Sequence, residues 1–297
     1  MNAAACAILN DGRLHLQHGP IDLIIEAFAD ARRDREIAYE QASIRFSSLL
    51  SNLVTELQQL RAPLSDHFPL FNDPVAQRMA RAAWPYRDEF ITPMAAVAGA
   101  VADEILQSLI AGRNLRRAYV NNGGDIAIHL SPGEMFDIGI AGAESAALNG
   151  QFTLHAEDNV RGIATSGWRG RSFSRGIADS VTVLAANAAE ADAAATIIAN
   201  AVNVEHPGIE RVPACEIQTE SDLGSLLVTR GVPVLDSASA NAALKAGEVA
   251  AKKYLDDELI ERAAIRLQGQ VRIVPNVSFP RRRESMLRKS PRTQQRV

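Results

Sequence analysis

The stretch Arg161–Val202 reads RGIATSGWRGRSFSRGIADSVTVLAANAAEADAAATIIANAV, and it decides the fold. Its β-branched run Ile163–Ser166 predicts a strand, which a loop rich in glycine, arginine and serine follows at Gly167–Gly176. The apolar run Val181–Ala185 predicts a second strand, and an alanine-rich segment of helical length comes directly after it. The stretch therefore predicts two strands joined by a cationic loop, with a helix after the second strand.

The alanine-rich helix carries a start signal and two oxygen-bearing side chains. Asn187 is placed to cap it, with Glu190 three residues later in the capping-box position. Asp192 and Thr196 are four residues apart, so both project from one face, one turn apart. Opposite an arginine-rich loop, this pair indicates two oxygens for a hard cation beside a cradle for phosphate. A solvated loop and two satisfied polar residues are the alternative interpretation.

The loop supplies the charges that a phosphate cradle needs. Cationic side chains and hydroxyl donors are the groups that hold phosphate oxygens. The loop contains Arg169, Arg171 and Arg175, and Ser172 and Ser174, with Ser166 just before it, add hydroxyl donors. Trp168 suits a place against a flat ring, or equally a place packed on its own hairpin.

Three helices are predicted upstream of this stretch. Glu36–Arg61 has apolar residues at three- and four-residue spacing and is stopped by a proline. Asp73-Pro74 predicts the start of a second helix, with a cap and a proline at the first position. Thr92-Pro93 repeats this device for Met94–Ala111, which is small and apolar around much of its circumference and is expected to be buried. Asp103 is then an acid on a largely buried helix, either at its wet edge or in a site.

From Arg117 onward the hydrophobic period changes to two. Five successive segments read as short strands, namely Ala118–Asn121, Ile126–Leu130, Met135–Ala141, Gln151–His155 and Arg161–Thr165. Between the first two, the glycines of Asn122-Gly123-Gly124 permit positive φ or close approach to a ligand, although an ordinary hairpin turn also explains them. A run of strands between helical stretches predicts an α+β fold, with mainly antiparallel sheets covered by helices.

The C-terminal part is expected to add shorter elements and a tail. The predicted elements are a strand at Ala214–Gln218, a short helix at Asp222–Leu227, a helix at Ser239–Leu255, and a hairpin formed by Ala263–Leu267 and Val271–Val274. We predict a single domain over residues 1–277. Residues 278–297 are basic and have almost no apolar periodicity, so we predict a disordered tail there.

Composition narrows the classes of function. The chain has 297 residues, 47% of them hydrophobic and only 5% aromatic, so aliphatic and alanine packing must fill the core. The net charge of −4 argues against a general nucleic-acid or membrane-surface binder, and no apolar run approaches a membrane span. The two cysteines, Cys6 and Cys215, lack disulfide or metal spacing. The first residues lack the features of a secretory signal, so a cytoplasmic location is expected.

Several motifs, taken in order along the chain, resemble the ApbE-like family of flavin transferases. Three stretches of this chain are similar to the last motifs of the family: Thr165-Ser166-Gly167, Asp179-Ser180-Val181-Thr182-Val183, and Ala191-Asp192-Ala193 with Thr196. Upstream, Asn122-Gly123-Gly124-Asp125 resembles the double-glycine turn of the family, and Gly99–Asp103 resembles its glycine-to-aspartate helix motif. The resemblance covers roughly residues 92–203. The residues of Thr92–Asp103 and of His18–Asp22 are more similar to those of a shorter, functionally uncharacterised branch of the same superfamily.

The resemblance implies an ApbE-like fold, FAD as a cofactor and a Mg²⁺ site with Asp192 and Thr196 as ligands. A flavin or another phosphorylated small molecule would be the partner. The residues that it assigns to this ligand, together with the loop residues discussed above, are Asn122, Gly123, Gly124, Asp125, Thr165, Ser166, Gly167, Trp168, Arg169, Arg171 and Arg175. We expect all of them to converge on one pocket.

The chain departs from the family where catalysis is concerned. Ala98 stands where the family has a lysine, and SFSRGIAD replaces the segment His-Ile-x-Asp-Pro-x-Thr-Gly that carries the proposed base. Deprotonation of an acceptor hydroxyl then falls to Asp179 or Asp103, or does not occur. Two classes of function stay open: a Mg²⁺-dependent FAD transferase or pyrophosphatase, with a protein as the acceptor, and a non-catalytic protein that binds flavin or another phosphorylated ligand. A third possible class of function is an accessory role in a catabolic complex. The sequence does not predict the oligomeric state.

Overall fold

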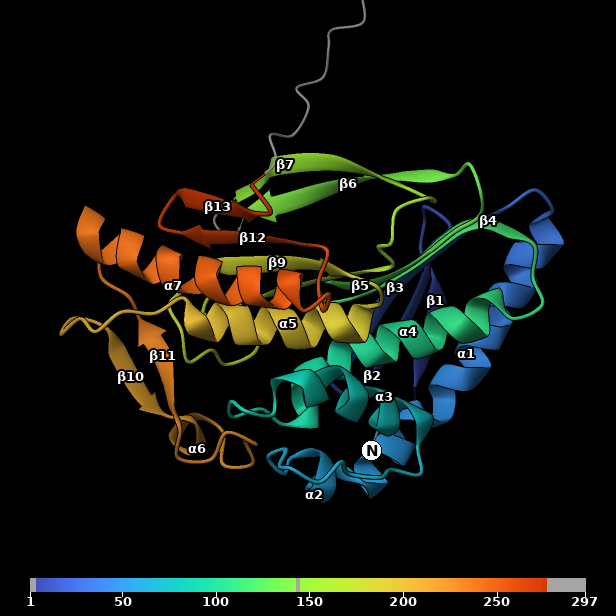
Figure 1. Cartoon of the computed structure of the whole chain (residues 1–297). Coiled ribbons are helices and arrows are strands. Elements are labelled where there is room, and N and C mark those ends of the chain that lie inside the picture. The colour runs from blue at the N-terminus through green and yellow to red at the C-terminus, as the bar shows by residue number, and fades with distance from the viewer. Residues whose placement is uncertain (1–3, 143–144, 277–297) are drawn as a thin grey trace, which may run out of the picture.

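A nine-stranded sheet forms the centre of the molecule (Figure 1). The computed structural model describes residues 4–142 and 145–276, so the predicted tail at 278–297 lies outside the described residues. Every pair of neighbouring strands is antiparallel, which confirms the predicted α+β class. In spatial order the strands are β1 (Ala5–Ile8), β2 (Leu14–His18), β3 (Ile21–Ala29), β4 (Leu115–Asn122), β5 (Asp125–Leu130), β8 (Gly162–Ser166), β9 (Ser180–Ala185), β12 (Arg262–Leu267) and β13 (Gln270–Val274).

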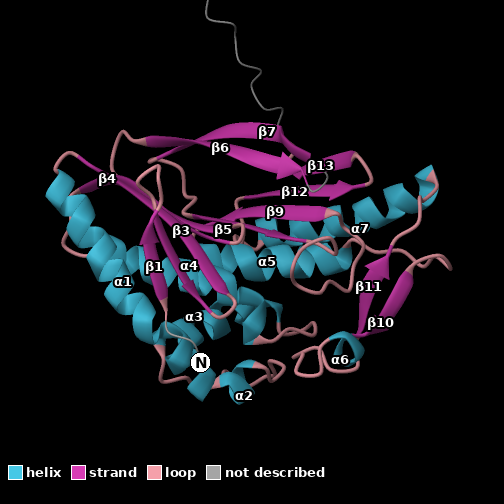
Figure 2. Cartoon of the chain, turned by 180° about the vertical axis from the view of Figure 1, so that it is seen from behind, coloured by secondary structure: helices cyan, strands magenta, loops and turns pink. Residues whose placement is uncertain are grey.

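Helices cover one face of this sheet, as Figure 2 shows from the strand side. The main core lies between the two layers and is built mostly from alanine and aliphatic side chains. The larger helices are α1 (Arg32–Thr55), α3 (Pro74–Ala83), α4 (Val97–Ile110), α5 (Ala188–Ala201) and α7 (Ser237–Asp256). Short turns of helix are α2 (Leu57–Leu60), η1 (Trp84–Tyr86), η2 (Pro93–Ala96) and α6 (Ala214–Ile217).

A hairpin covers part of the opposite face. It consists of β6 (Met135–Gly142) and β7 (Ser145–His155), which pair with each other as a separate two-stranded sheet. Successive strand residues point to opposite faces, so Ala127 belongs to the main core and its neighbour Ile128 to a second, smaller core beneath the hairpin. The central strands are therefore covered on both sides, although the sheet is antiparallel.

Two of the three predicted helix caps are confirmed, and the third is wrong: Thr92 makes no side-chain cap, because its hydroxyl donates to the carboxylate of Asp222 instead. The Asp73 carboxylate accepts hydrogen bonds from the N–H groups of Val75 and Ala76, and Asn187 accepts one from the N–H of Glu190. The predicted helix at Glu36–Arg61 begins earlier, at Arg32, and is interrupted at Glu56. The predicted helix at Met94–Ala111 begins as the 3₁₀ turn η2 before α4 continues it.

Two predictions for the C-terminal part were wrong. Ala214–Gln218 is not a strand, because residues 214–217 form the single helical turn α6. Asp222–Leu227 is not a helix: turns lead there into β11 (Leu227–Gly231), which pairs with β10 (Glu210–Pro213). Segments of four to six residues hold too few positions for their periodicity to separate helix from strand.

Within the described residues, the segment Pro93–Ile110 has the length and composition of a membrane-spanning helix, so the expectation that no apolar run approaches such a length was wrong. Its 18 residues are 61% buried inside the molecule, between α3, α5 and the sheet. The prediction that this segment is a buried helix is confirmed, and its apolar character is accounted for by core packing.

Candidate functional site

Two glycines let the amino end of α5 approach its neighbours at backbone distance. A Cβ added to Gly99 of α4 would lie 2.2 Å from the carbonyl oxygen of Ala188, and one added to Gly162 of β8 would lie 2.0 Å from the carbonyl carbon of Asn187. No side chain fits at either place. The alanines of α5 extend this close packing, so the first turns of α4 and α5 are held together above β8.

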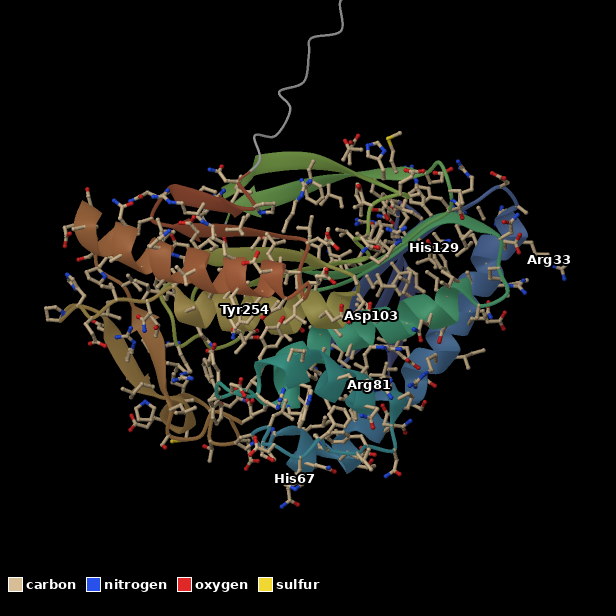
Figure 3. All side chains as sticks on the ribbon, in the orientation of Figure 1. Arg33, His67, Arg81, Asp103, His129 and Tyr254 are labelled. Carbon is tan, nitrogen blue, oxygen red and sulfur yellow. The ribbon has the colours of Figure 1, made fainter. Side chains whose placement is uncertain are left out.

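At this junction each helix supplies a carboxylate that accepts hydrogen bonds from the amino end of the other helix. Asp103 of α4 accepts hydrogen bonds from the N–H groups of Ala188 and Ala189 of α5, at 3.1 and 2.9 Å. Asp192 of α5 accepts one from the N–H of Gly99 of α4, at 3.0 Å. Figure 3 shows Asp103 where the two helices meet. Since the first N–H groups of a helix have no partner inside it, each acid caps the other helix.

Asp192 also faces a second acid, Asp125, at the start of β5. Asp125 accepts a hydrogen bond from the N–H of Thr165 at 3.2 Å. Burial raises the pKa of the Asp125 carboxyl above its ordinary value. Burial first, and the charge of Asp125 second, raise the pKa of Asp192 well above its ordinary value. The two carboxylates therefore lie close enough to repel each other, with little water around them.

The predicted double-glycine turn lies beside this acidic pair. Asn122 pairs with Asp125 across the turn, and its side-chain N–H donates to the carbonyl oxygen of Ala98 at 3.1 Å. Gly123 has φ +66°, and a Cβ there would lie 1.8 Å from the Nη2 atom of Arg171. The Arg171 guanidinium thus rests on the turn, and its charge opposes the rise in the pKa of Asp125.

A second group of the predicted residues is held together around Asp179. Arg169 donates to one oxygen of Asp179 at 2.9 Å, and its guanidinium lies 4.9 Å from the ring centre of Trp168. The backbone N–H of Gln268 donates to the other oxygen of Asp179. Both carboxylate oxygens of Asp179 therefore have donors from the protein.

The remaining predicted residues contribute unequally. Thr165 reaches Asp125 only through its backbone, because its hydroxyl lies 2.9 Å from that of Thr182 on the opposite face of the sheet. Ser166 pairs with the buried Val181 and so points to the helix side. Arg175 is held through its backbone N–H by the Asn200 side chain at 2.9 Å. Thr196 is partly exposed, one turn after Asp192 on α5.

The donor set of the acidic pair fits Mg²⁺. Across residues 4–142 and 145–276, no group of three or more histidine, cysteine, aspartate and glutamate side chains could hold a metal. Mg²⁺, however, is commonly bound by one or two carboxylates, with waters and substrate phosphates completing the shell. Asp125 and Asp192 supply two carboxylates, and the hydroxyl of Thr196 is on the same helix face as Asp192.

Sequence reasoning missed two side chains that build the site. Asn200 was not singled out, and Asn121 was placed only at the end of a predicted strand, although its side chain accepts from the N–H of Gly124 and so fixes the turn. For Asn200 a signal existed, since it continues the four-residue spacing of Asp192 and Thr196. Gly99 was singled out as the first residue of a helix motif, but the backbone that it approaches, that of Ala188, lies 89 positions away and is not visible in any local pattern.

A family model described as AbpE bacteria matches residues 6–273 of this chain. A UPF0280 protein of Methanococcoides burtonii is 42% identical over 121 residues, which are 40% of this chain and 50% of that protein. Another, of Methanopyrus kandleri, is 38% identical over 134 residues, 45% of this chain and 51% of that protein. The chain thus spans about half the length of these curated relatives.

Among solved structures, the chain is similar to a protein titled flavin transferase ApbE from Vibrio cholerae. The likeness covers 91% of this chain and 96% of that one, at 12% identity and a TM-score of 0.43. A flavinyl transferase ApbE from Pseudomonas stutzeri gives 11% identity and a TM-score of 0.36, over 91% and 93% of the two chains. The family assignment therefore rests on the match to the family model over residues 6–273. Structural similarities with TM-scores below 0.5 carry no argument about activity.

Proposed function

This chain belongs to the ApbE-like family described as AbpE bacteria, and from that premise we propose that it binds FAD together with Mg²⁺ at the junction of α4 and α5. The single observation that carries the proposal is the acidic pair Asp125 and Asp192, with the guanidinium of Arg171 beside it at Gly123. Two carboxylates that repel each other favour a divalent cation between them, because it offsets both charges.

The surrounding groups suit a diphosphate. Arg171 is exposed at the edge of the acidic pair, where its N–H groups can hold the outer oxygens of a phosphate. Asp125 and Asp192 would hold the cation, with Thr196 as a further oxygen donor. A bound Mg²⁺ neutralises phosphate oxygens and stabilises the charge that develops on a leaving phosphate. The reaction that this site supports best is therefore cleavage of the FAD diphosphate, with FMN passing to an acceptor protein or to water.

One observation favours a second candidate function, binding of FAD without transfer. Asp179 has a donor on each oxygen, and Asp103 caps α5 with both of its oxygens. Although Asp103 lies close enough to Asp192 to raise its pKa further, beyond the effect of burial, the carboxylates of Asp103 and Asp179 are both already held by donors from the protein, which disfavours either as the general base. Transfer to a hydroxyl and cleavage by water both gain from a general base, whereas binding needs none, so the absent family histidine counts against catalysis and not against binding.

The test compares FAD binding and turnover with and without Mg²⁺. The wild-type chain should quench flavin fluorescence only when Mg²⁺ is present, and turnover would appear as AMP release or as flavin attached to an acceptor protein. Asp192→Asn keeps an oxygen for the N–H of Gly99 but removes the charge, and it should abolish Mg²⁺-dependent binding. Asp66→Asn, at an exposed position on another segment, is the matched control.

Three outcomes separate the candidates. AMP release that Asp192→Asn abolishes supports the enzyme. Binding with no AMP release and no attached flavin supports the binding protein. No binding of FAD by the wild-type chain, in Mg²⁺ or without it, contradicts both.

A further inference from the structure

The loop Gly167–Gly176 is fixed at both ends and exposed in its middle. At its start, the N–H of Trp168 donates to the carbonyl oxygen of Ala178 at 3.0 Å. At its end, Thr229 of β11 bonds the carbonyl oxygens of Ser174 and Gly176, each at 2.8 Å. Residues 169–172 between these anchors are exposed. The loop can therefore change shape in the middle while its ends stay in place.

Trp168 has an unusual hydrogen-bonding state. Its indole Nε1 is buried, yet no acceptor for it exists among the described residues. An indole N–H is a donor only, and a buried donor without an acceptor is unfavourable. The side chain is held where it is by other contacts, including the stacked guanidinium of Arg169. Another shape of the loop could give this N–H an acceptor.

Arg171 connects the loop to the acidic pair. It lies three residues after Trp168, and its guanidinium rests on Gly123 and acts on the charge of Asp125. A divalent cation at Asp125 and Asp192 removes the attraction that these carboxylates exert on the arginine, and a phosphate brought with the cation offers it a stronger partner.

We propose that the loop is a strap that a Mg²⁺–diphosphate group moves: Arg171 exchanges the Gly123 turn for the phosphate, and the indole N–H of Trp168 gains an acceptor. The inference rests on the proposed function and deepens it, because it names the group of the ligand that the loop senses. Since FAD, ADP and inorganic pyrophosphate share this group, all three should move the strap, whereas flavin without phosphate should not.

The test follows the two indole N–H groups of the full chain, labelled with ¹⁵N-tryptophan. Trp168→Phe assigns the peaks, and Trp84→Phe assigns them by elimination if that variant fails to fold. Saturating inorganic pyrophosphate with Mg²⁺ should shift the Trp168 proton downfield, as expected for a new hydrogen bond, and leave the Trp84 peak in place. Arg171→Gln should weaken pyrophosphate binding by about tenfold or more, since it removes a charge-assisted hydrogen bond. Arg33→Gln, on the exposed start of α1, is the control.

The failures can be told apart when calorimetry measures binding on the same samples. If pyrophosphate binds with Mg²⁺ and the Trp168 peak does not move, the strap is wrong and the proposed function stands. An unchanged affinity in Arg171→Gln would reject the strap and the phosphate contact proposed for Arg171, and would leave the cation site at Asp125 and Asp192 standing. If neither pyrophosphate nor FAD binds in the presence of Mg²⁺, both the strap and the proposed function are rejected.

Discussion

The amino ends of α4 and α5 are each capped by an aspartate from the other helix, but the two aspartates differ in their remaining partners. At the start of α5, Asp103 is buried and uses both carboxylate oxygens on backbone N–H groups. At the start of α4, Asp192 accepts a hydrogen bond from the N–H of Gly99 and faces the like charge of Asp125. The first acid is fully occupied by the fold, while the second lies against a like charge that Arg171 offsets only in part.

The difference teaches how to separate a structural acid from a binding acid. Burial raises the pKa of Asp103 to about 6, although the N–H groups of Ala189 and Ala188 work in the opposite direction. The pKa of Asp192 is raised by burial and then further by Asp125. A raised pKa is therefore common to both acids, and the partner of each carboxylate distinguishes them.

The largest effect is expected at the occupied acid. Asp103→Ala leaves two buried N–H groups without acceptors, and each such loss costs about 1–3 kcal/mol, so we expect roughly 3 kcal/mol less stability. Urea unfolding followed by circular dichroism measures it, with Asp192→Asn as the matched change at the other helix end. A loss below about 1 kcal/mol would mean that Asp103 does not hold α5.

A smaller effect is expected where the two helices touch. In Gly99→Ala the new Cβ would lie 2.2 Å from the carbonyl oxygen of Ala188, so α4 and α5 must move apart. Overpacking of this kind costs about 1–3 kcal/mol. The same unfolding measurement applies, and the displaced Asp192 should also weaken divalent-cation binding. Unchanged stability together with unchanged cation binding would contradict the close approach.

The smallest effect concerns pH. A carboxyl whose pKa is raised on folding binds more protons in the native state, so its contribution favours folding at low pH and is lost as pH rises from its ordinary value of 3.8 through the folded pKa. Without divalent cations, Asp192→Asn should therefore be more stable than wild type near pH 7.5, by about 1 kcal/mol, and equal to it near pH 4. Thermal unfolding at the two pH values tests this, and Mg²⁺ should remove the difference at pH 7.5. A variant less stable than wild type at pH 7.5 would contradict the repulsion.

The elements with long patterns were predictable from the sequence. The strands after Arg117 show a clear period of two, and the caps Asp73 and Asn187 mark helix starts by residue type alone. Residues 214–227 were assigned wrongly, because their turns are fixed by hydrogen bonds such as that from the N–H of Ala214 to the carbonyl oxygen of Leu226. Such bonds depend on tertiary placement, which short segments do not encode locally.

For the site, sequence supplied the residue types and the structure supplied their partners. Asp192, Gly123, Asp125 and Arg171 were singled out from motifs and spacing, and the fold brings them together. Asp179 was singled out in the same way but is held by Arg169 and the N–H of Gln268, a residue 89 positions away. Which acid is capped and which is left against a like charge depends on such long-range contacts, so residue type alone could not decide it.

The acidic pair is tested most directly by counting divalent cations. Mn²⁺, which has the oxygen-ligand preference of Mg²⁺ and an electron paramagnetic resonance signal, is titrated into the full chain in the presence of ADP. We predict one bound Mn²⁺ in the wild-type chain and in Asp66→Asn, and loss of that ion in both Asp125→Asn and Asp192→Asn, with all four proteins folded by circular dichroism. A bound ion that survives both single changes, or no bound ion in the wild-type chain, would contradict the assignment of Asp125 and Asp192 as a divalent-cation site.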